Sequence, residues 1–293
     1  MLGATGLTSI LPSSLDRPIT AVIHAGYVRL RPGRIERYAG RVREVFDTAD
    51  SPVGVDEART IAIAYMRMRV EIRWLRARGA GGRPDRVPTA VEGFEHVEEA
   101  LAQGRGVILW RMSTTSAAVL NAALAERGRP IVHLSAAEHM LARPPLLSRS
   151  WWGALNTRDE ARWLAERVVI PADGSLGYLA RLREALDRGG VVSIVGDLTT
   201  GRATVEHRIG TTTFALPTGA PSLSHVTGAA LLPCAVLRTG PLSYTVTIRR
   251  DVADRDAVDR RAFRRAAVAQ FGSWVEDVGR AHPDSWIFWG RAD

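Results

Sequence analysis

The chain has 293 residues, of which 46% are hydrophobic and 24% charged, so it can build a large core and is not a disordered protein. All 39 basic residues are arginine, which excludes enzymes that use a lysine nucleophile, a Schiff base or a P-loop lysine. The net charge of +8 favours an anionic partner: a phosphorylated coenzyme, a lipid head group, an acidic carrier protein or RNA.

Residues 1–80 predict a helical N-terminal region, with helices at 15–27, 34–46 and 55–76. In the third helix, apolar residues such as Ile61 and Met66 lie between arginines. This pattern fits an amphipathic helix packed on the core, and it also fits a helix on an anionic membrane surface. The chain lacks the run of ~18–20 apolar residues that spans a bilayer, and its start lacks the features of a secretory signal. We therefore expect a cytoplasmic protein, soluble or membrane-peripheral.

A glycine-rich, basic segment at 78–87 separates this region from an α/β body at 88–293. Predicted strands lie at 107–110, 130–134, 167–170, 191–195, 213–216, 231–238 and 244–249. Predicted helices lie at 94–103, 115–127, 176–188, 219–227 and 260–280, and a capping box at Ser135–Glu138 opens another. The aromatic residues of the tail, 283–291, are expected to pack on the body. The sequence thus predicts an α/β fold, a three-layer mixed sheet flanked by helices with a helical N-terminal region.

The stretch 106–116 joins a buried strand to a tightly packed helix. Open α/β sheets place their chemistry at such junctions, because strand ends converge there and helix N–H groups favour negative charge. The site is therefore expected near 111–118. Ser113 is a candidate nucleophile, and Thr114 and Thr115 are candidate contacts to substrate or donor. Their hydroxyls can instead cap the helix.

A second strand, 191–195, leads to Asp197 at the same edge of the sheet. A carboxylate there needs a partner, so Asp197 is either catalytic or part of a structural cap or ion pair. The polar segment 198–210 is predicted to be a long loop with a functional role, because structureless loops of this size are uncommon. Four basic side chains either form a phosphate clamp around this edge or are solvated at the surface: Arg111, Arg202, His207 and Arg208.

Cys234, the single cysteine, lies in the apolar run 231–237 and is expected in the core, because reactive thiols need electropositive, partly exposed surroundings. One cysteine also excludes a disulfide framework and a cysteine-based zinc site. We expect no bound metal and no resident cofactor.

Several segments occur in the order and spacing of a known family: 102–109, 186–197, 216–221, 227–233 and Pro283-Asp284-Ser285-Trp286. They make the chain similar to the bacterial lysophospholipid acyltransferase superfamily, in the branch of the late lipid A acyltransferases and the phosphatidylinositol mannoside acyltransferases. The similarity covers roughly residues 30–290. It implies acyl transfer from a coenzyme A or carrier-protein thioester to a hydroxyl group.

That family has a His-x4-Asp/Glu dyad just after the strand at 107–110, where the histidine deprotonates the acceptor hydroxyl and the carboxylate orients the histidine. In this chain those two positions hold Ser113 and Ala118. His133 and Glu138 repeat the spacing one strand later, so either the dyad has moved there or His133 is an ordinary strand-end histidine. Asp197 matches the family's aspartate after the central strand, whereas the arginine expected after the second strand has no clear counterpart.

Three functions fit these observations, and we favour the first. The first is transfer of an acyl group from acyl-CoA or an acyl carrier protein to a hydroxyl, amine or hydroxylamine, with catalysis by positioning and an oxyanion-stabilising helix end. An amine needs less help from a base, which suits the missing histidine. The second is aminoacyl transfer from an aminoacyl-tRNA in small-molecule biosynthesis, which would use the arginine surplus. The third is a non-catalytic protein that keeps an acyl or lipid pocket.

Overall fold

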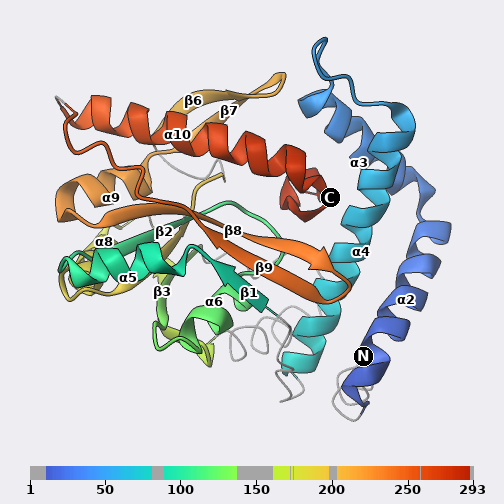
Figure 1. Ribbon diagram of the computed structural model, residues 1–293, viewed down its shortest axis with the longest axis horizontal. Coiled ribbons are helices and arrows are strands. Elements are labelled where there is room, and N and C mark those ends of the chain that lie inside the picture. The colour runs from blue at the N-terminus through green and yellow to red at the C-terminus, as the bar shows by residue number, and fades with distance from the viewer. Residues whose placement is uncertain are drawn as a thin grey trace.

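The computed structural model describes residues 11–80, 89–136, 161–197 without 172 and 174, and 203–290 without 258. Its centre is a seven-stranded sheet with the order β1-β9-β8-β2-β5-β3-β4 (Figure 1). The strands are β1 (Thr89–Glu92), β2 (Val107–Arg111), β3 (Ile131–Ala136), β4 (Leu164–Ile170), β5 (Val191–Val195), β8 (Ala230–Gly240) and β9 (Ser243–Ile248). β8 and β9 are antiparallel and the other neighbouring pairs are parallel, which confirms the predicted mixed α/β sheet.

Helices cover both faces of the sheet and complete the three layers. On one face, α5 (Phe94–Ala102) and α6 (Ala117–Ala125) bury apolar side chains against Leu109 of β2. The other face carries α8 (Gly177–Asp187), α9 (Gly219–Thr227) and α10 (Arg260–Ala281). There the rings of Trp110 and Phe271 stack with centroids 4.0 Å apart. Because successive strand residues point to opposite faces, β2 is buried on both sides and is almost continuously apolar.

The N-terminal region is helical, as predicted. After the short turn η1 (Ser13–Leu15), the helices α2 (Asp16–Leu30), α3 (Pro32–Phe46) and α4 (Val55–Ala80) stand beside one end of the sheet (Figure 1). Met66 and Met68 of α4 are fully buried, so this helix packs on the body. Of the predicted linker at 78–87, residues 78–80 still belong to α4 and the rest lies outside the described residues. No described helix is both long and apolar enough to cross a bilayer.

Glu71 attaches this helical region to the sheet. Its carboxylate is fully buried and accepts hydrogen bonds from the Arg238 guanidinium of β8 at 2.8 and 2.9 Å. The Arg67 side chain donates to the same carboxylate at 3.2 Å. α3 and α4 also share one hydrophobic core with the α10 face of the sheet. That residues 1–80 form a unit of their own stays a prediction.

Two predictions about local structure are wrong. The second half of the segment 198–210 is not a loop but the strand β6 (Thr204–Ile209), which pairs with β7 (Thr212–Pro217) in a hairpin that packs on α10. Exposed side chains alternate along β6 with covered ones, as a half-buried strand requires. Ser135 does not open a helix, because it lies in β3 opposite Val169. Glu138 lies outside the described residues.

Candidate functional site

The ends of β2 and β5 bring Ser113 and Asp197 together. The two strands are parallel neighbours with Arg111 beside Val195, and each candidate residue follows two positions later. The Ser113 hydroxyl lies 2.7 Å from both carboxylate oxygens of Asp197, and the Ser113 N–H donates to Oδ1 at 2.9 Å. The expectation that Asp197 has a partner at this edge is confirmed, and one partner is Ser113.

Trp286 adds a third contact to the Ser113–Asp197 pair. It lies between the C-terminal turns η3 (Pro283–Ser285) and η4 (Ile287–Gly290), and its indole N–H donates to Asp197 Oδ2 at 2.9 Å. The sequence predicted only that the tail aromatics pack on the body, so this polar contact was missed. Asp197 is 1% exposed and Ser113 8% exposed. Ser113 is therefore the more accessible member of the pair.

The backbone holds these C-terminal turns on the end of β2. The Ile287 N–H donates to the Ser113 carbonyl at 2.9 Å, and the Thr115 N–H donates to the Ser285 carbonyl at 3.0 Å. Thr114 and Trp286 form a β-bridge. The buried position of the Ser113–Asp197 pair thus depends on a distant segment, since Trp286 follows Asp197 by 89 residues. The Pro-Asp-Ser-Trp motif at 283–286 was its only signal in the sequence.

Thr114 and Thr115 fix the turn between β2 and α6. Thr114 Oγ1 accepts a hydrogen bond from the Val236 N–H at 2.9 Å, and the Thr115 hydroxyl donates to the Val236 carbonyl at 2.8 Å. These hydroxyls therefore do not cap α6, because β8 continues past the end of β2 and offers them its backbone. Ser116, at the N-cap of α6, makes no side-chain cap bond, and the first helical residue, Ala117, is half-exposed. A helix N-terminus that lacks a side-chain cap can bind an anionic group through its first N–H groups.

Arg111 and His133 lie on the α5/α6 face of the sheet. Arg111 follows Leu109 with the strand period, and His133 sits beside Ser193 of β5, which in turn pairs with Leu109. Both side chains are buried. Nearby, the Arg167 guanidinium donates to the Ser135 hydroxyl at 3.0 Å. Polar residues of neighbouring strands, including the guanidinium groups of Arg111 and Arg167, therefore lie side by side on a sheet face that is otherwise apolar.

Cys234 belongs to the core, as predicted. It pairs with Arg111 across the β2–β8 register. Burial raises the pKa of its thiol to about 12, although the charge of Arg111 acts in the opposite direction. A thiol with this pKa is protonated at neutral pH and is not a nucleophile.

Of the four basic residues predicted to form a phosphate clamp, the three that the structure describes do not lie together. The His207 ring packs on Gly272 of α10, on the face of the sheet opposite Arg111, and desolvation lowers its pKa despite the nearby Glu276. Arg208 is exposed, and its Nε–H donates to the Gly210 carbonyl at 3.1 Å. Arg202 lies outside the described residues. Among the described members of this set, only Arg111 lies at the edge where β2 and β5 end.

Comparison with known proteins supports the resemblance seen in the sequence. No curated protein matches the chain significantly. The family model described as "Bacterial lipid A biosynthesis acyltransferase" matches residues 57–291, from the start of α4 to the end of the C-terminal turns. The match includes the whole sheet with Ser113, Asp197 and Trp286, and it indicates acyltransferase activity in general. The chain belongs to the bacterial lipid A biosynthesis acyltransferase family.

Proposed function

We propose that the protein transfers an acyl group from an activated ester or thioester, such as acyl-CoA or an acyl carrier protein, to a hydroxyl, amine or hydroxylamine at the ends of β2 and β5. One observation carries the proposal. The Ser113 hydroxyl, at the position where the resemblance implies a histidine, lies 2.7 Å from both oxygens of a buried carboxylate, Asp197. A hydroxyl held in this way can accept a proton from an acceptor as it passes its own to the carboxylate.

The exposure of the two residues supports different roles for them. Asp197 is almost fully covered by Ser113 and Trp286, so an acceptor reaches Ser113 first, and Asp197 acts through it as a positioning residue. The acceptor oxygen or nitrogen attacks the donor carbonyl carbon, and the carbon–sulfur bond breaks. The acceptor proton passes by way of Ser113 to Asp197 and then to the leaving thiolate. The open N-terminus of α6 stabilises the oxyanion that forms in between.

Charge and location support the choice of donor. The chain carries a net charge of +8, and Arg111 lies at the same edge as the pair, so phosphates of coenzyme A or the surface of an acidic carrier protein would be attracted. The proposal needs no metal and no resident cofactor. It places the protein in the cytoplasm, with peripheral membrane contact through the N-terminal helices where the acceptor is a lipid. His133, on the α5/α6 face, is the alternative base.

The test is release of free thiol from acyl-CoA and from an acyl carrier protein, with hydroxylamine and lipid acceptors. The Ser113→Ala and Asp197→Asn variants should lose about a hundredfold or more of the activity, the usual contribution of acid–base catalysis. Ser193→Ala is the matched control, because Ser193 is a buried β5 serine whose hydroxyl has no hydrogen-bond partner among the described residues. It should keep full activity, and so should His133→Asn unless the base has moved there.

The wild-type outcome separates the other functions. Turnover only with an aminoacyl-tRNA donor would replace acyl transfer by aminoacyl transfer. Retention of bound acyl-CoA or lipid without any turnover would identify a binding protein that has kept the fold. Full activity of both site variants would remove Ser113 and Asp197 from the mechanism.

A further inference from the structure

The junction of α2, α3 and α4 holds an arginine–tyrosine cluster, which consists of Tyr27, Arg31, Arg34, Arg69 and Arg73 (Figure 1). Tyr27 lies near the end of α2. Its phenol oxygen accepts a hydrogen bond from Arg34 Nη1 of α3 at 2.7 Å and another from the side chain of Arg73 of α4. The Arg34 Cζ also lies 5.9 Å from the centre of the Tyr27 ring. One phenol thus binds guanidinium groups from two different helices.

The charges that act on this phenol are of one sign. Arg73, Arg34 and Arg69 are the charged groups with the largest effect on it, and all three are cations. Burial raises the pKa of Tyr27, but the hydrogen bond of Arg73 and the charges of the three arginines outweigh burial, so the net pKa is lowered. The Arg69 guanidinium donates to two further phenols at 3.4 Å each. Among the described residues, neutral phenols rather than carboxylates therefore accept the hydrogen bonds of these arginines.

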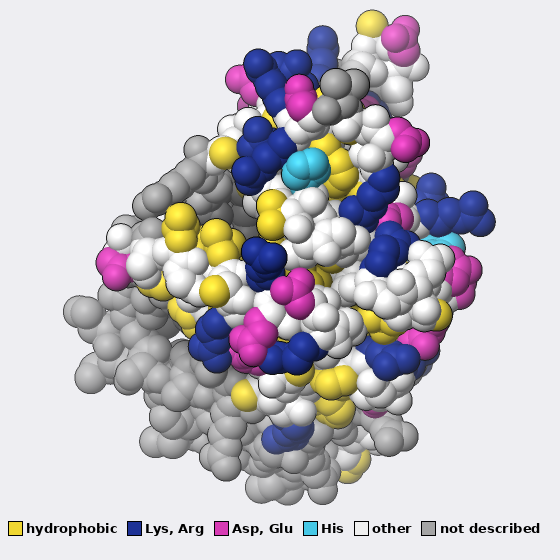
Figure 2. Space-filling model, turned by 90° about the vertical axis from the view of Figure 1, so that its left-hand side faces the viewer, with side chains coloured by type: hydrophobic (Ala, Val, Ile, Leu, Met, Phe, Trp, Pro, Cys, Tyr) yellow, Lys and Arg dark blue, Asp and Glu magenta, His cyan; other side chains and the backbone are white. Residues whose placement is uncertain are grey.

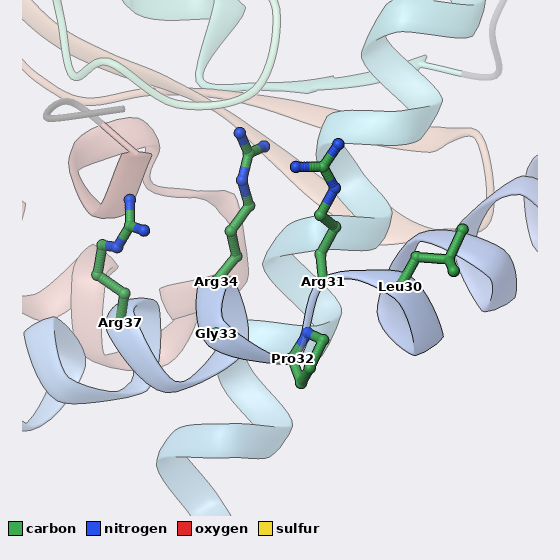
Figure 3. Close-up of a pocket in the computed structure, with 6 residues that line it drawn as sticks. All are labelled: Leu30, Arg31, Pro32, Gly33, Arg34 and Arg37. Atoms are coloured by element: carbon green, nitrogen blue, oxygen red, sulfur yellow. The ribbon is translucent and has the colours of Figure 1, made fainter.

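A hollow opens beside the cluster, at the corner between α2 and α3. It has a volume of about 460 Å³ and is lined by Leu30, Arg31, Pro32, Gly33, Arg34 and Arg37. Figure 3 shows the guanidinium groups of Arg31 and Arg34 close together and extending to the same side. Arg31 is exposed and makes no ion pair with any described residue. The hollow therefore has the size of a small-molecule site and a lining rich in guanidinium groups.

The local charge is positive. Residues 27–43 contain six arginines and one carboxylate, Glu36, which pairs with Arg59 of α4 at 3.0 Å. Other surfaces differ, because arginines and carboxylates are interspersed over the described atoms of the face in Figure 2, and pairs such as Arg129 with Glu98, at 2.8 Å, neutralise each other. Guanidinium groups repel one another, so the gathering at the helix junction costs free energy that a bound anion would offset.

We propose that the arginine–tyrosine cluster binds the diphosphate group of a soluble nucleotide. Guanidinium groups bind phosphate oxygens through paired hydrogen bonds. Arg31 and Arg34, from the α2–α3 corner, contact one phosphate, and Arg73, from α4, contacts the other. The Tyr27 oxygen accepts from its two arginines and still has its own proton to donate to a phosphate oxygen. A diphosphate matches more of the positive charge than a single phosphate does.

The arrangement favours a small ligand over a nucleic acid. A nucleic acid is bound by cations that follow its backbone along an extended groove. These cations instead gather around one phenol and reach from the surface inward, because Arg31 is exposed whereas Arg34 and Arg69 are only partly exposed. A ligand of nucleotide size fits such a cluster, and the phosphates are its most highly charged part.

The diphosphate can come from two sources, the coenzyme A of an acyl donor or a free nucleotide. The cluster is linked to the candidate site, because Arg69 donates to the Tyr65 hydroxyl and this hydroxyl donates to the Ile287 carbonyl at 3.3 Å. The Ile287 N–H in turn donates to the Ser113 carbonyl. The coenzyme A source rests on the proposed function, whereas a free nucleotide binds whether or not the protein transfers acyl groups.

The experiment is isothermal titration calorimetry of the full-length protein in detergent-free buffer, with ADP, coenzyme A, inorganic pyrophosphate and inorganic phosphate as probes. ADP and pyrophosphate should bind about tenfold tighter than phosphate or better, because the second phosphate adds charge-assisted hydrogen bonds. Arg34→Gln and Arg73→Gln should each weaken pyrophosphate binding about tenfold or more, and Arg31→Gln about fivefold. Coenzyme A that binds tighter than ADP would identify the donor as the source, and equal binding would identify a free nucleotide.

Tyr27 provides a second measurement, because the ionisation of tyrosine is followed by ultraviolet absorbance. Bound pyrophosphate should raise the pKa of Tyr27, since its negative charge opposes that of the surrounding arginines. Tyr27→Phe should remove this change from the titration curve. A change that persists in Tyr27→Phe would place the anion elsewhere and would overturn the inference.

The matched control is Arg265→Gln, which removes an exposed arginine of α10 and should bind pyrophosphate like the wild type. Ser113→Ala should do so too, so failure of the acyl-transfer mechanism and failure of this inference are distinguishable. Absence of binding to ADP and pyrophosphate would overturn the inference, and so would binding that the cluster variants leave unchanged. Transfer RNA that binds far tighter than ADP and loses affinity in the same variants would replace the nucleotide site by a nucleic-acid surface. Because Arg31 is exposed, its variant keeps the test valid if the Arg34 and Arg73 variants unfold.

Discussion

Trp286 and Trp289 allow the charge at the candidate site to be measured against an internal reference. Both indoles are fully buried in one aromatic cluster, with centroids 5.2 Å apart, and both donate a hydrogen bond through Nε1. Trp286 donates to the Asp197 carboxylate at 2.9 Å, whereas Trp289 donates to the Pro283 carbonyl at 2.6 Å. Replacing either with phenylalanine removes the same atoms. The difference between the variants therefore isolates the charge of the acceptor.

The expected magnitude follows from the two bonds. A hydrogen bond to a charged group contributes about 1.5–3 kcal/mol and one between neutral groups about 0.5–1.5 kcal/mol. The lost packing is similar in the two variants and cancels in the comparison. Trp286→Phe should therefore lower the free energy of unfolding by about 1 kcal/mol more than Trp289→Phe does.

Urea denaturation followed by far-UV circular dichroism measures both values without depending on tryptophan fluorescence. Adding Asp197→Asn to each variant completes a double-mutant cycle. The cycle with Trp286 should show a coupling energy above about 0.5 kcal/mol, and the cycle with Trp289 should be additive within that limit. Equal losses for the two tryptophan variants, together with two additive cycles, would refute the assignment of a charged Asp197 beneath Trp286.

Three further perturbations test other parts of the structure. Glu71→Gln removes the buried carboxylate that binds Arg238 and leaves only the more distant Asp284, so it should cost about 3 kcal/mol of stability in urea denaturation. Glu184→Gln, in an exposed pair, should cost less than about 1 kcal/mol. Burial lowers the pKa of His207 below its usual 6.5 in the folded protein, so as the pH falls the unfolded chain takes up a proton at this residue before the folded chain does. The contribution of His207 to stability is therefore complete above pH 6.5 and is lost as the pH falls toward the lowered pKa. His207→Gln should flatten this part of a stability–pH curve, and an unchanged slope would contradict the desolvation. Gly196→Ala would force a Cβ into the Trp110 indole and the Phe271 ring and should cost about 1–3 kcal/mol, with a loss of near-UV circular dichroism.

The sequence predicted the half of the site that depends on local patterns. β2 and β5 are buried on both faces, so each reads as an uninterrupted apolar run, and residues that follow parallel strands meet at one edge. That rule alone places Ser113 near Asp197. It cannot predict the contact of Trp286 with Asp197, because the C-terminal tail makes this contact by folding back onto the sheet. The aromatic residues of the tail have no periodic spacing that would indicate where one indole N–H points.

The errors have a common physical source, which is that polar residues serve strands as well as loops. Thr204, Glu206 and Arg208 point to solvent along β6, so the segment has the composition of a loop while its alternation is that of a strand. Ser135 matches the start of a capping box but lies in β3, where its hydroxyl accepts a hydrogen bond from Arg167 of the neighbouring strand β4. In both cases the partner strand, which is not visible in the local sequence, decides the structure.

Arg238 connects the helical region to the turns that cover the site. Its guanidinium binds the Glu71 carboxylate of α4 and lies 3.7 Å from the Asp284 carboxylate of η3, and its backbone N–H donates to the Ser285 hydroxyl at 3.0 Å. Ser285 precedes Trp286 directly. A continuous set of bonds therefore runs from α4 to the residue that covers Asp197.

This arrangement limits how an acceptor can reach the carboxylate. In the proposed reaction, the described residues leave an acceptor two routes to Asp197: past Ser113, or by displacement of Trp286. Displacing Trp286 would require either that the hydrogen bonds and ion pairs of Arg238 break or that α4 moves together with the C-terminal turns. α4 is also bound to α2 through the buried ion pair of Asp16 and Arg78. Breaking a buried ion pair is costly, whereas the route past Ser113 breaks none of these contacts. The geometry therefore favours direct approach of the acceptor to Ser113, while Trp286 and the C-terminal turns stay in place and shield Asp197 from solvent.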